Sequence, residues 1–168
     1  DVIIFDESAQ LKTPNSQRSQ CAQAIADGSR QDNDPYIILM SGAPAPKSPA
    51  DWWRQCEIAC PGFVKESHPR PFQSRLAKIE QCLALTGGTY PKLVTWWDDE
   101  NKCAHCGRYR DDPVHTFGLS PDYCGVYQKS VNEVEALYRR LQGLVLVQFK
   151  RDCLDLPEKV YRTVKCET

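Results

Sequence analysis

The sequence lacks a long apolar run, an excess of one charge and a signal peptide. No stretch of about 18 apolar residues occurs in its 168 residues, so no membrane span is expected. Its 21 lysine and arginine residues nearly balance 22 aspartate and glutamate residues, which argues against a nucleic-acid binder that acts through charge alone. With 41% hydrophobic and 26% charged residues, the composition is typical of one globular domain rather than a disordered tail.

Nine cysteines are present, a high and odd number. A secreted scaffold with this many cysteines would usually be much shorter. Because no basic, apolar signal peptide opens the chain, we expect an intracellular protein, in the cytoplasm, the nucleoid or nucleus, or a host cytoplasm if viral. Six cysteines lie singly in apolar or helical patterns and are expected to be small buried hydrophobes: Cys21, Cys56, Cys60, Cys82, Cys153 and Cys166.

Apolar runs alternate with a helical pattern in the first part of the chain. Residues 2–5 predict a fully buried strand, and a helix follows between Ser16 and Gly28, where the glycine is expected to end it. Residues 36–40 form a second strand-like run. Strand, helix and strand at this spacing predict a βαβ unit with a parallel sheet. Because a domain rarely opens on a buried strand, we expect the chain to be a fragment of a longer protein.

Capping signals place the later elements. Ser48 before Pro49 predicts a helix that ends at Pro61, and Ser130 predicts another that ends at Gly143. A helix over 75–85, a glycine-bearing break at 86–90 and strands over 144–147 and 160–164 are also expected. Together these elements predict an α/β fold in which helices flank a parallel sheet. The helix after Ser130 is expected to bury Val131, Val134, Leu137, Tyr138 and Leu141.

Asp6 and Glu7 follow the first predicted strand directly. Ligands of open α/β sheets bind at the carboxyl ends of parallel strands. One carboxylate there can hold the water shell of Mg²⁺, and the other can orient or deprotonate an attacking water. Acids also commonly start a loop or cap a helix at this position, so the pair alone does not decide the function.

Four stretches carry a recognisable pattern: DESAQLKTPNS at 6–16, LMSGAP at 39–44, SPADWW with PGF within 48–63, and KRDCLDLPEK at 150–159. In this order they resemble motifs of the Swi/Snf-type ATPases, a branch of the superfamily-two helicases. The first two resemble that family's second and third motifs. The third is similar to the following helix and turn, and the fourth to the junction toward the second lobe.

The resemblance implies a partial RecA-like lobe of a P-loop NTPase, which hydrolyses Mg-ATP and translocates along double-stranded DNA. It assigns Asp6 to the Mg²⁺ shell of Mg-ATP and Glu7 to the attacking water. It assigns Ser41 and Gly42 to the link between nucleotide state and lobe closure. The lobe core would span residues 1–90, and residues 130–168 would return to it and lead to the second lobe.

The sequence also departs from the family. Ala9 stands where many relatives have His, Ala43 replaces the usual Thr, and Val147 with Gln148 replaces the usual Arg pair. No Gly-x-x-x-x-Gly-Lys-Ser/Thr phosphate loop occurs in the chain. We therefore expect that this chain alone does not hydrolyse ATP, although the complete protein does.

Residues 91–129 read as a small insertion into the lobe. Cys103 and Cys106 form a Cys-x-x-Cys-Gly knuckle, whose two thiolates can grip one Zn²⁺ while the glycine permits a tight turn. His115 and Cys124 are the available second pair, which gives three sulfurs and one nitrogen. His105 is an alternative ligand, but it lies between the two thiolates and would point away.

A cysteine pair without metal is the plainer interpretation of this segment. A redox pair would more usually open a helix after a strand, whereas here acids precede the pair and polar residues follow it. A loop-rich segment buries little core, so a structural zinc ion is the preferred prediction. The segment could contact DNA or a protein partner. The alternative function is a non-enzymatic, zinc-bearing interaction domain on a degenerate ATPase fold.

Overall fold

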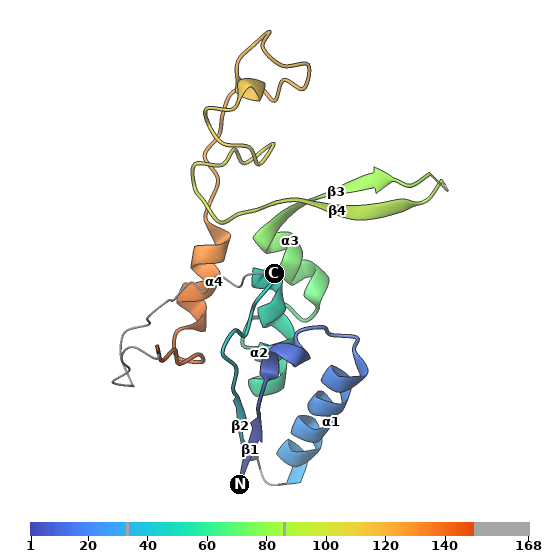
Figure 1. The fold of residues 1–168 in the computed structure, drawn as a ribbon, viewed down its shortest axis with the longest axis vertical. Coiled ribbons are helices and arrows are strands. Elements are labelled where there is room, and N and C mark those ends of the chain that lie inside the picture. The colour runs from blue at the N-terminus through green and yellow to red at the C-terminus, as the bar shows by residue number, and fades with distance from the viewer. Residues whose placement is uncertain (33, 86, 150–168) are drawn as a thin grey trace, which may run out of the picture.

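Figure 1 shows the computed structural model of the protein, which describes residues 1–32, 34–85 and 87–149. The fold is mixed α/β, with two two-stranded sheets among these residues. No helix in this part of the chain is long and apolar enough to cross a bilayer. In chain order the elements are β1 (Val2–Phe5), η1 (Ser8–Leu11), α1 (Gln17–Asp32), β2 (Tyr36–Leu39), η2 (Pro49–Asp51), α2 (Trp52–Ala59), α3 (Pro69–Leu76), β3 (Ala77–Leu83), β4 (Thr89–Trp96), η3 (Pro113–His115) and α4 (Glu133–Leu141).

The predicted βαβ unit is confirmed. β1 and β2 pair in parallel, with Val2 opposite Tyr36 and Phe5 opposite Leu39, and α1 connects them. One face of this sheet packs against α1 and α2, because Phe5, Ile37 and Leu39 contact buried side chains there. The mixed α/β class therefore agrees with the prediction, while the RecA-like assignment stays a prediction. The buried side chains under this face are Leu11, Ala22, Ala26 and Ile58.

The prediction that β1 is fully buried is wrong. Val2 and Ile4 are 56% and 58% exposed, and Tyr36 and Ile38 of β2 are 78% and 43% exposed. Side chains of a strand alternate between the two faces of its sheet, so these four share one face. Among the described residues, helices cover only the opposite face, which leaves an apolar face open to solvent.

The prediction that Gly28 ends the first helix is also wrong, since α1 continues to Asp32. A tertiary contact accounts for the extra turn. The Arg30 guanidinium donates hydrogen bonds to the carbonyls of Ile58 and Ala59 at the end of α2, the latter at 3.0 Å. These bonds also satisfy two carbonyls that a helix C-terminus leaves without partners.

The start of α2 follows its sequence signal. Ser48 and Asp51 form a capping box around η2, with Pro49 at its first position, and α2 continues from Trp52. The helix ends at Ala59, and Gly62 then adopts a φ of 76°. Both ends of this element were predicted.

The prediction of a helix over residues 75–85 is wrong. α3 ends at Leu76, and Ala77–Leu83 forms β3, which pairs antiparallel with β4. Of the predicted break at 86–90, the described residues 87–90 lie at the tip of this hairpin and at the start of β4. A cross-strand partner beyond the turn overrides the local helical spacing, because Ile79 pairs with Leu93 across the hairpin.

α4 begins at Glu133 with Asn132, not Ser130, as its N-cap. The side-chain Oδ1 of Asn132 accepts a hydrogen bond from the Glu135 amide at 2.8 Å, whereas Ser130 is buried and its hydroxyl donates to the Asp99 carbonyl. Leu137 and Leu141 are buried as predicted. Gly143, with a φ of 97°, follows the helix end. Of the other residues expected on the apolar face, Val134 is buried, but Val131 and Tyr138 are exposed, at 66% and 46%.

Residues 144–147 do not form the predicted strand; a single bridge joins Gln142 and Val145. The strand expected over 160–164 and the motif at 150–159 lie outside the described residues, as do Cys153 and Cys166.

The main hydrophobic core joins α2, α3 and α4. Phe72 and Leu76 of α3 and Leu137 of α4 are fully buried in it. Of the cysteines expected to be buried, Cys56 belongs to this core, Cys82 is half-buried, and two are exposed at the surface: Cys21 and Cys60.

The elements are spread along the molecule, as Figure 1 shows. β1, β2 and α1 lie at one end, and the loop-rich chain around η3 lies at the other. The β3–β4 hairpin projects sideways between them. The two predicted sites therefore lie far apart.

Candidate metal centre and acidic site

The Cys-x-x-Cys-Gly turn has the conformation that its glycine predicts. The amide of Gly107 donates to the carbonyl of Cys103 at 2.8 Å, which closes the knuckle. Gly107 has a φ of 77°, and a Cβ at this position would lie 2.3 Å from Cγ2 of Thr95. The glycine is thus required both by the backbone conformation and by the close approach of β4.

The other two candidate ligands come from η3 and the loop after it. Asp112 caps η3 by accepting a hydrogen bond from the Val114 amide at 3.0 Å, and this turn presents His115. The Cys124 amide donates to the Val114 carbonyl at 2.8 Å, so the loop returns beside η3. Both ligands are therefore held by backbone hydrogen bonds.

The structure brings the four predicted ligands together. One ligand atom from each of Cys103, Cys106, His115 and Cys124 lies within 4.8 Å of every other. Sγ of Cys103 and Sγ of Cys124 are 4.0 Å apart, and Sγ of Cys106 is 3.3 Å from Nε2 of His115. In a tetrahedral zinc site, bond lengths of about 2.3 Å to sulfur and about 2.0 Å to nitrogen place two sulfurs about 3.8 Å apart and a sulfur and a nitrogen about 3.5 Å apart. The cluster could therefore hold a metal such as zinc.

The electrostatics of the cluster also suit a cation. Burial disfavours the charged form of Cys103, but hydrogen bonds, the strongest from the Gln128 backbone, outweigh it and lower the pKa of this thiol to about 6. Burial, then hydrogen bonds and repulsion from the two neighbouring cysteines, raises the pKa of Cys124 to about 11. Neighbouring thiols resist ionising together, and a divalent cation between them would remove that resistance.

His105 is not a member of the cluster. Its backbone carbonyl accepts a hydrogen bond from the Lys78 ammonium of β3. His68, the third histidine of the chain, caps α3, with Nδ1 accepting from the Arg70 amide at 3.3 Å. His115 directs Nε2 at the cluster and packs edge-on against Tyr127, with ring centroids 5.7 Å apart.

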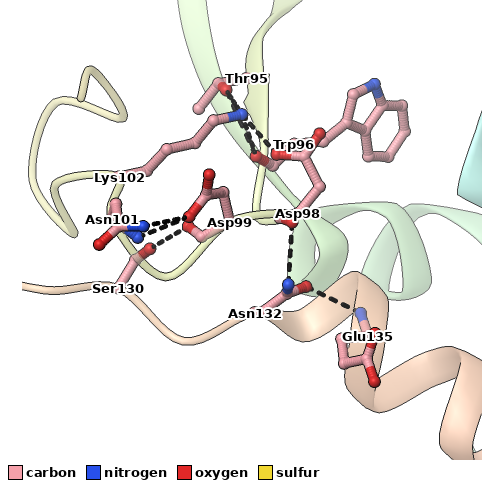
Figure 2. A network of polar contacts seen from close by, with 9 residues as sticks. All are labelled: Thr95, Trp96, Asp98, Asp99, Asn101, Lys102, Ser130, Asn132 and Glu135. Atoms are coloured by element: carbon pink, nitrogen blue, oxygen red, sulfur yellow. Dashed lines mark hydrogen bonds and ion pairs between the residues drawn. The ribbon is translucent and has the colours of Figure 1, made fainter.

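A polar network that the sequence analysis missed anchors this segment to the rest of the fold (Figure 2). The Lys102 ammonium is buried beside the first ligand cysteine and donates to Thr95 Oγ1 at 2.9 Å and to the Trp96 carbonyl at 3.0 Å. It also pairs with the Asp98 carboxylate at 2.5 Å. In the sequence, the run of acids before the knuckle indicates that Lys102 could form an ion pair. It does not indicate whether this lysine is buried or exposed.

The far end of the segment is tied to the same place. Asn132 donates to the Asp98 carbonyl at 2.8 Å while it caps α4, and the Ser130 hydroxyl donates to the Asp99 carbonyl at 3.1 Å (Figure 2). The Ser130 amide donates to the Lys102 carbonyl at 2.9 Å. The chain therefore leaves β4 and enters α4 at one shared junction.

Asp6 and Glu7 lie at the carboxyl end of β1, as predicted. Glu7 adopts a left-handed conformation with a φ of 52°, and its amide donates to Oδ1 of Asp6 at 2.8 Å. Both acids line a cavity of about 420 Å³, together with Arg18 and Cys21 of α1. Carboxylate oxygens on an open cavity suit a hard cation that keeps part of its water shell.

Asp6 also lines a second cavity, of about 700 Å³. Ser41 and Gly42, which follow β2, line the same cavity, and so does Gln55 of α2. The structure thus brings Asp6, Ser41 and Gly42 to one site, while Glu7 faces the smaller cavity.

Comparison with known proteins found no match: no protein-family model, no curated protein and no solved structure matches this chain. The Swi/Snf-type resemblance therefore stays a prediction from the sequence motifs, and the described geometry carries the functional argument.

Proposed function

We propose that this chain is part of the first RecA-like lobe of a DNA-dependent ATPase of the Swi/Snf type, and that the complete protein hydrolyses Mg-ATP. One observation supports this most. The parallel pairing of β1 and β2 brings the loops that resemble the family's second and third motifs to one edge of the sheet, where Asp6, Ser41 and Gly42 line a common cavity.

The acids have distinct roles in this proposal. When bound, Mg-ATP supplies the γ-phosphorus that is attacked and a cation that neutralises phosphate charge. Asp6 would hold the water shell of the cation, and Glu7 would orient the attacking water and accept its proton. The phosphate loop and the arginine finger would come from other parts of the complete protein, so this chain alone is expected to be inactive.

The test is ATP hydrolysis by the complete protein, with and without double-stranded DNA, beside its Glu7→Gln variant. We expect DNA-stimulated hydrolysis that falls by about 10²- to 10⁴-fold in the variant. The matched control is Glu135→Gln, which changes an exposed glutamate of α4 that pairs with Arg139 at 3.2 Å. Undiminished hydrolysis in Glu7→Gln would contradict the role of this residue, and no hydrolysis by the unaltered protein would contradict the function.

We further propose that the Cys103, Cys106, His115 and Cys124 cluster holds a structural zinc ion. Four protein ligands close a tetrahedron and leave no open position for a substrate. The segment also needs such a staple, because Cys103 and Val114 are its only buried hydrophobic residues among those that the structure describes. An ion held here would stabilise the segment and any partner surface that it carries.

Metal analysis of the purified protein tests this proposal. We expect about one zinc per chain, lost in Cys106→Ser and retained in Cys82→Ser, which changes a half-buried cysteine of the β3–β4 hairpin. Chelation should lower the thermal midpoint of the unaltered protein. A protein that purifies without zinc, and whose midpoint a chelator leaves unchanged, would contradict the zinc centre.

The second candidate is a non-enzymatic zinc-bearing domain that binds nucleic acid or a protein on a degenerate ATPase fold. It is favoured by the ligand cluster, in which four ligand atoms are already gathered, and by the alanines at positions 9 and 43. It predicts zinc and partner binding but no hydrolysis by the complete protein. The hydrolysis assay therefore separates the two candidates.

A further inference from the structure

We propose that Gln55 is a positioning residue that couples the loop after β1 to the loop after β2. The catalytic consequence of this coupling rests on the proposed ATPase function, whereas the coupling itself is a property of the fold. Gln55 lies in α2, is 4% exposed, and belongs to none of the motifs that the sequence analysis identified as functional.

The side-chain amide of Gln55 joins the two loops directly. Its Oε1 accepts a hydrogen bond from the Ser8 hydroxyl at 3.0 Å. Its Nε2 donates to the Pro44 carbonyl at 2.6 Å. It also donates to the carbonyl of Asp51, the residue just before α2, at 3.1 Å. Ser8 follows the two acids directly, and Pro44 follows the Ser41–Gly42 pair, so one side chain contacts both motif loops.

The orientation of this amide is fixed by its partners. Rotating the amide by half a turn would place its oxygen against the Pro44 and Asp51 carbonyls, which are acceptors only. Both Nε2 hydrogens are used in the observed orientation. Because Gln55 and Ser8 are only 4% and 2% exposed, leaving one of these polar groups unpaired would be costly.

Backbone hydrogen bonds bring the same loops together closer to the sheet. The Ser8 amide donates to the Met40 carbonyl at 2.9 Å, and the Met40 amide donates to the Phe5 carbonyl at 2.9 Å. Through its bond to Pro44, Gln55 also holds the second loop at a residue that lies past the end of β2. A displacement of one loop is therefore transmitted to the other through a buried side chain.

This contact supplies a link that the motif itself lacks. Ala9 has no polar side chain with which to reach the second loop, although many relatives of the resembled family have histidine there. Gln55 instead uses the neighbouring Ser8 and sets the distance between Asp6 and the Ser41–Gly42 pair across their shared cavity. Small errors in such distances reduce the rate of the chemical step more than they reduce substrate binding.

The catalytic test uses the complete protein with Gln55→Met, which keeps the length of the side chain but removes its hydrogen bonds. We expect kcat to fall by about 10- to 100-fold while KM for ATP changes by less than about threefold. Ser8→Ala should lower kcat by less, and adding it to Gln55→Met should change kcat little further, because both act through one contact. Gln20→Met, which changes an exposed glutamine of α1, is the control and should leave both constants unchanged.

A second measurement tests the coupling whether or not the protein hydrolyses ATP. Amide hydrogen exchange should become faster in Gln55→Met at both 8–10 and 41–43, and in neither loop of Gln20→Met. If Gln55→Met does not fold, Ser8→Ala gives the same readout with one bond removed. Faster exchange in one loop alone, or unchanged kcat in a folded Gln55→Met with an active parent, would overturn the proposal. An inactive parent whose two loops respond together would instead overturn the ATPase function and leave the coupling standing.

Discussion

Replacing Lys102 by methionine tests whether a buried ammonium anchors the metal-binding segment. Methionine has a similar length and suits a buried site, but it removes the bonds to Thr95, Trp96 and Asp98. The lysine side chain is 10% exposed, so those bonds form with little competition from water. Hydrogen bonds to a charged group contribute about 1.5–3 kcal/mol each to stability. The variant no longer has to bury a charged ammonium, and this gain offsets part of the stability lost with the bonds.

The Asp98 carboxylate limits the expected loss. It is 48% exposed and returns to water when its partner is removed, whereas the Trp96 carbonyl loses a buried donor. We therefore expect the free energy of unfolding to fall by about 2 kcal/mol. For a chain of this size the thermal midpoint would fall by roughly 4–8 °C. Chemical denaturation of the metal-saturated protein gives the free energy, and calorimetry gives the midpoint.

Lys129→Met is the matched control for this experiment. Lys129 pairs with Glu100 at 2.5 Å, the same separation as in the Lys102–Asp98 pair, but the two side chains are 60% and 59% exposed. Exposed pairs contribute little, so this variant should unfold almost as the unaltered protein does. Equal losses in both variants, or no loss in Lys102→Met, would show that burial does not set the contribution of the Lys102 ammonium.

Three further predictions concern other parts of the fold. Phe72→Ala should lower the free energy of unfolding by about 3–5 kcal/mol, because Phe72 is 0% exposed in the core; a loss below about 1 kcal/mol in denaturant titration would contradict this. Gly107→Ala should lower the thermal midpoint more than Gly118→Ala, since both have positive φ but only the former would place a methyl group 2.3 Å from a β4 side chain; equal midpoints would argue against the close approach. Burial, with smaller contributions from neighbouring charges, raises the pKa of Cys56 to about 12, so iodoacetamide at pH 8 should label the exposed Cys21 and spare Cys56, as read by mass spectrometry. Because that pKa lies above the ordinary thiol value of 9.0, the Cys56 contribution to stability is complete below pH 9 and is lost as the pH rises toward 12.

Features set by neighbouring residues could be predicted from the sequence. The turn at Ser48 and Pro49 and the knuckle at Cys103 depend on residues a few positions apart, and the structure shows both. The βαβ unit followed from two β-branched runs around a helical pattern. The pairing of the knuckle with His115 and Cys124 was predicted by elimination, because few other ligands were available nearby.

Features set by distant partners could not be predicted. Ala77–Leu83 is a strand because β4 lies opposite it, and α1 passes Gly28 because Arg30 reaches the end of α2. Gln55 and Lys102 resemble ordinary polar residues in the sequence. Their importance comes from burial beside Ser8 and Trp96, which no local pattern reports.

The shared junction at Asp98, Asp99, Ser130 and Asn132 has a consequence for how this protein can vary. The junction holds the ends of the intervening segment together whatever lies between them. The entropy of closing a flexible loop grows slowly with its length, by about 0.6 kcal/mol for each doubling. Insertions and deletions between Lys102 and Ser130 should therefore add little to the cost of closing the loop, and α4 can keep its place in the core while the segment beyond the junction is lengthened, shortened or exchanged for another module.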